Sequence, residues 1–102
     1  MSKPESLGFS SERLARIAPF LKQRYIDSGK LPCAQVQVWR RGHLAYETTL
    51  GLADRERGKP LKADSLFRIY SMTKPVTSVA FMMLVEEGLV ALDEPVAKYI
   101  PE

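Results

Sequence analysis

The sequence has few of the residues that metal sites and disulfides need. Its 102 residues include one cysteine, one histidine and no asparagine. A single cysteine, Cys33, forms no disulfide within the chain and is typical of a reducing compartment. Together with His43 it cannot supply the three or four ligands of a zinc site. We therefore expect no metal, and no pattern of residues predicts a cofactor.

Long apolar runs are also absent. The longest, residues 79–85, is far shorter than the roughly 20 residues needed to cross a bilayer. The first six residues, Met-Ser-Lys-Pro-Glu-Ser, contain no apolar stretch of the kind found in secretory signal peptides. These features predict a cytoplasmic location and no membrane association.

Charge of one sign is not concentrated in any segment. The net charge is +3 and the pI is about 9.2, but Arg55, Arg57 and Lys59 alternate with Asp54 and Glu56. No aromatic residues lie between the basic residues to stack on bases. A small basic nucleic-acid binder is the hypothesis that this pattern disfavours, and we expect no nucleic-acid partner.

The composition is that of a globular protein, with 45% hydrophobic residues, and the periodicity of these residues predicts an α+β fold. Ser10 is expected to be the N-cap of a helix that ends near Ser28, with apolar residues at helical spacing along one face. Pro19 conflicts with this helix, because an interior proline removes a hydrogen bond. Residues 34–51 then alternate between apolar and polar and predict an antiparallel β-hairpin, with its turn at 41–42.

A second helix is expected in the last third of the chain. A polar loop leads to residues 66–70, which read as a short strand or an extended lead-in. The helix itself runs from near Ser71 to Glu87 and is closed by Gly88. It is apolar nearly all round, which predicts a helix buried on more than one side, and one helix and a hairpin cannot cover it fully. A short helix with Asp93 as its N-cap follows.

Ser71 and Lys74 stand three residues apart at the start of this helix, in the stretch YSMTKP. Residues at this spacing share a helix face. Backbone N–H groups at a helix start favour negative charge on a serine oxygen. A lysine can take a serine proton near neutral pH only if its pKa falls by roughly 3 units from about 10.4. Pro75 fits the same geometry, because proline is tolerated in the first helical turn.

An ordinary helix start explains the same residues without any chemistry. The pattern S-x-x-K arises by chance in roughly one chain in three of this length. Ser71 would then be an N-cap, and Lys74 a solvated residue of the first turn. Spacing alone favours this reading over a nucleophile.

The sequence around Ser71 and Lys74 favours the nucleophile over an ordinary helix start. The stretch LFRIYSMTKPVTSVAFMMLVEEGLVALDEPVAKYIPE resembles the region around the nucleophile in serine hydrolases of the class C β-lactamase and penicillin-binding-protein superfamily, and β-lactamase-like carboxylesterases in particular. The phenylalanine before the serine, T-K-P, E-E-G and L-D-x-P-V-x-K-Y-x-P carry the likeness together. It extends back through the hairpin to about Ser10.

The resemblance assigns roles to two residues. Ser71 would be the acylated nucleophile, with its own backbone N–H forming half of the oxyanion hole. Lys74 would help to remove the serine proton. The family's second motif, Y-x-N or S-x-N, has no counterpart here, since the chain lacks asparagine. Its third motif, K-T-G or H-x-G, has no match after Lys74.

The resemblance therefore implies an incomplete β-lactamase-like fold consisting of the N-terminal helix, the hairpin and the nucleophile helix. We expect residues 1–102 to be the N-terminal part of a β-lactamase-related serine hydrolase domain. The full-length parent would hydrolyse a small ester or amide by acyl transfer, with ester hydrolysis favoured because no export signal is visible. The alternatives are β-lactam hydrolysis in that parent, or a non-catalytic fragment that self-associates through an exposed sheet edge.

Overall fold

The computed structural model describes all residues, 1–102, as two compact units, Met1–Leu66 and Phe67–Glu102. The first unit contains short helical segments and a three-stranded sheet in the order β1-β2-β3. The second contains the long helix α3 and a short C-terminal turn. The α+β composition expected from the sequence is confirmed at this level.

The N-terminal helical region is divided into short pieces: the 3₁₀ turn Pro4–Leu7, α1 (Ser11–Leu14), α2 (Ile17–Leu21) and a π-helical turn, Lys22–Ile26. Ser10 caps α1 as expected, its Oγ accepting a hydrogen bond from the Arg13 N–H at 3.3 Å. The expectation of one helix from Ser10 to Ser28 is wrong. The helix restarts at Ile17, so that Pro19 falls in a first turn, where its missing N–H has no helical partner to lose.

The hairpin is confirmed. Strands β1 (Cys33–Arg40) and β2 (His43–Asp54) pair antiparallel, with Val36 opposite Thr48. Arg41 and Gly42 form the turn with φ of 51° and 76°. Two successive positive φ values are typical of the type I′ turn, which matches the twist of the two strands. The sequence did not predict β3 (Lys59–Pro60), which pairs with the end of β2.

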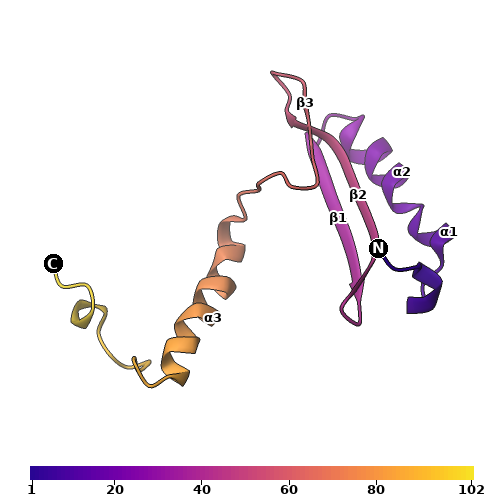
Figure 1. Ribbon diagram of the computed structural model, residues 1–102. Coiled ribbons are helices and arrows are strands. Elements are labelled where there is room, and N and C mark those ends of the chain that lie inside the picture. Colours follow the sequence, from indigo (N-terminus) through magenta and orange to yellow (C-terminus); the bar gives the residue numbers. More distant parts are fainter. The chain divides into compact units, whose positions relative to one another are not determined.

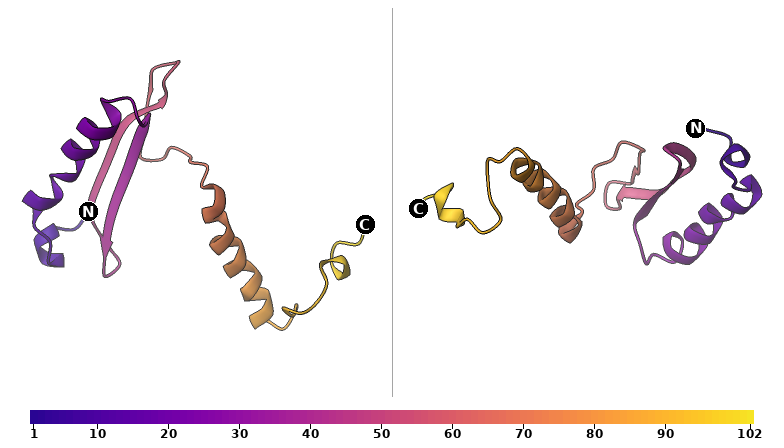
Figure 2. Two further views of the ribbon diagram at one scale, coloured as in Figure 1. Left: turned by 180° about the vertical axis from the view of Figure 1, so that it is seen from behind. Right: turned by 90° about the horizontal axis from the view of Figure 1, so that it is seen from below.

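A β-bulge determines where the small core of this unit lies. Val38 pairs with Tyr46 and Trp39 pairs with Leu44, which leaves Ala45 as the extra residue of β2. Ala45 is buried together with Leu7 and Leu14 of the helical segments, and Tyr46 packs against this cluster. Figures 1 and 2 show α1 and α2 along one face of the hairpin. The buried residues are Leu7, Leu14 and Ala45.

In the second unit, a 3₁₀ turn (Tyr70–Met72) continues directly into α3 (Thr73–Glu86). The expected helix and its end at Gly88, which has a φ of 73°, are confirmed. Residues 66–69 form a lead-in without regular secondary structure, not a strand, and Ile69 at its end is not extended, with φ of −94° and ψ of 1°. The expectation of a buried helix is wrong, because no residue of α3 is buried. Its unit adds only turns and one short helix, which cannot cover a 14-residue helix.

The C-terminal segment ends in a 3₁₀ helix, Val96–Lys98, with Pro95 at the cap position. Asp93 is therefore not the N-cap that the sequence predicted, and it lies in the preceding turn. The neighbouring Glu94 instead accepts a hydrogen bond from the Ala91 N–H, at 3.2 Å. None of the helices has the length and apolar character required to cross a membrane.

Candidate active site

Ser71 lies in the middle of the 3₁₀ turn that opens the long helix. The turn is closed by the Met72 N–H, which donates to the Ile69 carbonyl oxygen at 3.0 Å. The Ser71 N–H and hydroxyl have no hydrogen-bond partner in the chain. An unbonded N–H is expected at the start of a helix, and it leaves this donor available to an incoming oxygen.

Tyr70, directly before Ser71, has a left-handed backbone with a φ of 45°. This conformation is uncommon for a bulky residue and costs free energy. Tyr70 is the first residue of the 3₁₀ turn, so this left-handed backbone lies between the lead-in, residues 66–69, and Ser71. Sequence reasoning missed Tyr70, because no glycine or asparagine signals a left-handed position there.

Lys74 is the second residue of α3, and Pro75 is the third, within the first turn as expected. The spacing brings Ser71 and Lys74 to the same end of the helix, but no hydrogen bond joins their side chains, and Lys74 forms no ion pair. Both residues are exposed. Water therefore solvates both side chains, and the burial that a lysine base requires is not supplied by this chain.

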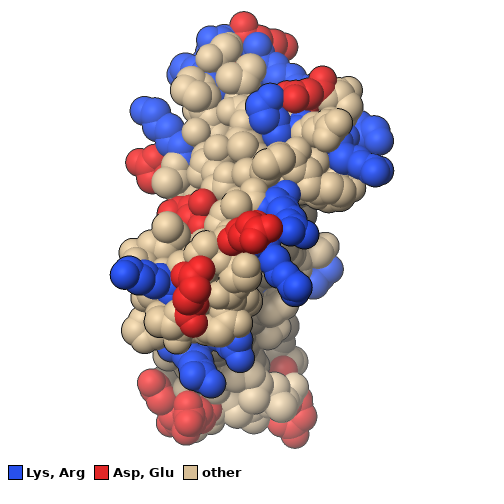
Figure 3. Space-filling model, turned by 90° about the vertical axis from the view of Figure 1, so that its right-hand side faces the viewer, with Lys and Arg blue, Asp and Glu red and all other residues tan.

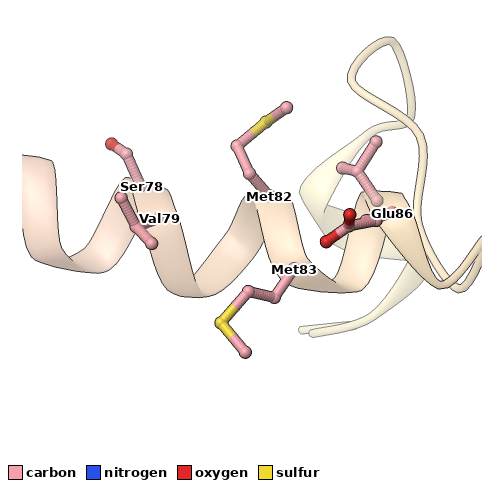
Figure 4. A pocket seen from close by; sticks show the side chains of 6 residues that line it. Ser78, Val79, Met82, Met83 and Glu86 are labelled. Atoms are coloured by element: carbon pink, nitrogen blue, oxygen red, sulfur yellow. The ribbon is translucent and has the colours of Figure 1, made fainter.

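The hollow along α3 does not form a site around this pair. It is lined by Ser78, Val79, Met82, Met83, Val85 and Glu86, with Met82 and Met83 pointing to opposite sides in the view of Figure 4. All of these residues follow Lys74 by at least one helical turn. The hollow is a shallow apolar surface on one helix, without a nucleophile and base to act together.

Charges of both signs are interspersed on the face shown in Figure 3. Several carboxylates pair with nearby basic residues, such as Glu12 with Arg16 at 3.1 Å and Asp27 with Lys22 at 2.9 Å. No basic stripe forms on this face.

The most strongly perturbed titratable group lies in the C-terminal segment. The Lys98 ammonium donates a hydrogen bond to Glu94 at 2.6 Å, and the Tyr99 hydroxyl and the Ala91 N–H also donate to this carboxylate. These contacts, that of Lys98 first, lower the pKa of Glu94 to about 2. The hydrogen bond to Glu94 also raises the pKa of Tyr99. These contacts hold the C-terminal turn together. The ion pair could have been predicted from the sequence, because Glu94 and Lys98 are four residues apart.

Comparison with known proteins identifies a family and several relatives that match most of the chain, including Ser71 and Lys74. The family described as Beta-lactamase matches residues 16–102. Esterase EstB of Burkholderia gladioli is 36% identical over 97% of this chain, and the mouse serine beta-lactamase-like protein LACTB, mitochondrial, is 36% identical over the same share. Penicillin-binding protein 4* of Bacillus subtilis is 32% identical over 59% of the chain. The matched regions are 25%, 18% and 13% of these relatives, so the chain spans about a quarter of their length or less.

Proposed function

The chain belongs to the Beta-lactamase family, and from that premise we propose that it carries the nucleophile of a serine hydrolase that cleaves carboxylic esters by acyl transfer. Ser71 is the nucleophile, and Lys74 is the residue that assists removal of its proton. Residues 1–102 form the N-terminal part of the hydrolase domain. The observation that supports this most is the position of Ser71, at a sharp turn with an unbonded N–H at the start of a helix.

In the first step, Ser71 Oγ attacks the ester carbonyl carbon while neutral Lys74 accepts the hydroxyl proton. The Ser71 N–H donates to the oxygen on which negative charge develops. The bond from the carbonyl carbon to the alcohol oxygen then breaks, and the alcohol leaves with the proton that Lys74 accepted, which restores neutral Lys74. Water cleaves the acyl-serine, which releases the carboxylic acid and restores the Ser71 hydroxyl.

Two contributions to this reaction have no source among residues 1–102. An oxyanion hole uses two hydrogen-bond donors, and residues 1–102 supply one of them, the Ser71 N–H. Lys74 also needs an environment that excludes water, whereas it is exposed here. We propose that both come from parts of the hydrolase domain outside this segment, consistent with the share of its relatives that the chain spans.

Ester hydrolysis is the first candidate, and a relative named as an esterase, which matches 97% of this chain and shares a quarter of its own length with it, supports it. A β-lactam is a cyclic amide that the same acyl transfer would open, and relatives with β-lactamase-like and penicillin-binding names support this second candidate. The third candidate is a non-catalytic fragment. The exposure of Ser71 and Lys74 supports it for the isolated chain, as does the position of the hollow on α3, which is lined only by residues from Ser78 onward.

The test is a hybrid protein in which this chain replaces the matching quarter of Esterase EstB. We expect the hybrid to hydrolyse a short-chain nitrophenyl ester. Ser71→Ala should lower kcat by at least about 10³-fold, and Lys74→Met by at least about 10²-fold, because each removes a group that acts in the transition state.

Two controls make the result interpretable. Ser78→Ala, in α3 but a turn beyond the candidate site, should leave kcat within about twofold. Far-UV circular dichroism of all variants should match that of the parent hybrid. A folded hybrid whose ester turnover is unchanged by Ser71→Ala would refute the proposed nucleophile, and a chromogenic β-lactam assayed in parallel decides between the two substrate classes.

A further inference from the structure

The segment between β3 and α3 contains one anchored loop, residues 61–65. The Leu61 N–H donates to the Gly51 carbonyl oxygen of β2 at 3.0 Å. The loop is also closed on itself, since the Lys62 N–H donates to Ser65 Oγ at 2.9 Å and the Ser65 N–H donates to the Lys62 carbonyl oxygen at 3.1 Å. This loop therefore has a defined shape and a main-chain attachment to the sheet.

A side chain of β1 supplies a second attachment. Gln35 Nε2 donates to the Ala63 carbonyl oxygen at 2.8 Å. Side chains alternate between the two faces of a strand, so Gln35 lies on the face opposite Val38, which packs against the core with the helical segments. Gln35 is half-buried, whereas Gln37, the next residue on the same face, is exposed. The loop is thus held by both long strands of the sheet.

Beyond this loop the main chain has no further hydrogen bond until the 3₁₀ turn that contains Ser71. No main-chain hydrogen bond involves residues 66–68, and Leu66 is fully exposed. Ser71 follows Ser65 by six residues, and a chain of this length spans no more than about 22 Å. The position of the loop therefore limits where the chain can place Ser71.

We propose that Gln35 is a positioning residue of the hydrolase: it holds the loop 61–65 on the sheet and so fixes the point from which the chain leads to Ser71. The inference rests on the proposed function, because the nucleophile that it concerns is the one assigned there. Gln35 touches neither the substrate nor the reacting atoms and acts through the loop. A misplacement of a reacting group by about 1 Å can lower a rate by about 10²-fold.

The chemistry of this contact predicts which replacements of Gln35 are tolerated. The Ala63 carbonyl oxygen is an acceptor, so the side chain at position 35 has to donate. Methionine has nearly the length and shape of glutamine but no N–H. Glutamate would place a negative carboxylate oxygen against the carbonyl oxygen. Lysine brings a flexible donor of sufficient reach and should restore the contact.

Kinetics of ester hydrolysis by the EstB hybrid test the role of Gln35. We expect Gln35→Met to lower kcat roughly 5- to 50-fold and to leave KM within about twofold, because the substrate site is intact and the nucleophile is misplaced. Gln35→Glu should lower kcat at least as far. Gln35→Lys should remain within about threefold of the parent hybrid.

Gln37→Met is the matched control. It removes the same amide from the next position on the same face of β1, where Gln37 Nε2 donates to Glu47 and not to the loop. We expect kcat of this variant to stay within about twofold of the parent. Far-UV circular dichroism and urea unfolding of every variant check that a loss of kcat does not come from a loss of fold.

A second substitution opens the loop from its other side. In Ser65→Ala the Lys62 N–H loses its acceptor. If Gln35 acts through the loop, Ser65→Ala should also lower kcat, and the double variant Gln35→Met, Ser65→Ala should lose clearly less than the product of the two single losses. This test also serves if Gln35→Met alone reduces the amount of folded hybrid.

Unchanged kcat in a folded Gln35→Met hybrid would overturn the proposal, and so would an equal loss in Gln37→Met. A loss that Gln35→Lys does not recover would overturn it too, since the donated hydrogen bond would then not be what matters. Ser71→Ala separates this proposal from the function on which it rests. Turnover that is lost in Ser71→Ala but complete in Gln35→Met refutes only the positioning role, whereas turnover that survives Ser71→Ala refutes the nucleophile itself.

Discussion

Tyr70 is the residue whose backbone joins the lead-in, residues 66–69, to Ser71. Its left-handed φ of 45° is unfavourable for a side chain with a Cβ, and most unfavourable for a β-branched one. In the EstB hybrid, Tyr70→Gly should retain kcat within a few-fold, since glycine adopts this backbone without strain. Tyr70→Ile should lower kcat roughly 5- to 150-fold, which corresponds to about 1–3 kcal/mol.

The measurement for Tyr70 is kcat and KM for each variant, with circular dichroism as a check of folding. A loss confined to kcat would indicate that Ser71 is misplaced in the transition state, not that substrate binding is weakened. Equal activity of the glycine and isoleucine variants would show that this backbone does not position the nucleophile.

Gly51 is the residue of the sheet least tolerant of a side chain. Its φ is 81°, and a Cβ there would lie 2.3 Å from the Pro32 carbonyl oxygen. Gly51→Ala should therefore lower the free energy of unfolding by about 2 kcal/mol or more. Gly58→Ala, at a φ of 62° but with open space around it, should cost only about 1 kcal/mol.

Urea unfolding followed by Trp39 fluorescence measures both glycine variants. The difference between their free energies of unfolding measures the cost of the clash with Pro32, because both variants have the cost of a left-handed backbone in common. Equal destabilisation by the two variants would mean that the strands separate at this point to accept a methyl group.

At the scale of elements, the C-terminal turn depends on one ionised carboxylate. The pKa of Glu94 is lowered to about 2 by hydrogen bonds from Lys98, Tyr99 and Ala91. A lowered pKa means that these contacts are fully present above the ordinary value of 4.5 and are lost as the pH falls through about 2. At the alkaline end the pKa of Lys98 is raised, chiefly by its hydrogen bond with Glu94, so the pair is lost only at high pH.

Nuclear magnetic resonance shifts of the Ala91 amide and the Tyr99 ring should report this transition. We expect both to titrate together near pH 2 in the native chain. In Glu94→Gln they should show no such step and should already resemble the acid form at neutral pH. Independent titration of the two signals, with a midpoint at the ordinary glutamate value, would contradict the shared hydrogen-bonded cluster.

The elements differ in how far the sequence predicts them, for local physical reasons. The hairpin follows from alternation and from Arg41-Gly42, because both signals act within a few residues. The N-terminal helix was predicted as one piece because its apolar spacing continues across Ala15 and Arg16. The helix restarts at Ile17, which accommodates Pro19, but the spacing of the apolar residues does not change there. The strand β3 is two residues long, which is too short for any periodicity.

The candidate site was predictable only in part. Ser71, Lys74 and Pro75 are local in sequence, and the structure places them at the helix start as their spacing indicates. The exposure of α3 was not predictable, because an apolar pattern on all sides indicates that a helix can be covered but does not identify the residues that cover it. Tyr70 was missed because its left-handed backbone has no typical residue type as its signal.

At the scale of the whole molecule, the isolated chain should show little or no serine-dependent turnover. Ser71 and Lys74 are exposed, and only one oxyanion donor is available. Purified 1–102 and its Ser71→Ala variant should hydrolyse a short-chain nitrophenyl ester at indistinguishable rates. Turnover by the native chain well above the variant would show that these residues suffice for catalysis.

The measurement that most directly tests the assignment of Ser71 is covalent labelling of the EstB hybrid. A fluorophosphonate, which loses fluoride when a serine oxygen attacks phosphorus, is added to the native hybrid and to its Lys74→Met variant, and the adduct is located by peptide mass spectrometry. We expect one phosphonate per molecule on Ser71, formed at least about 10²-fold more slowly in Lys74→Met. A catalytically active hybrid that carries the label on another residue, or none on Ser71, would contradict the assignment.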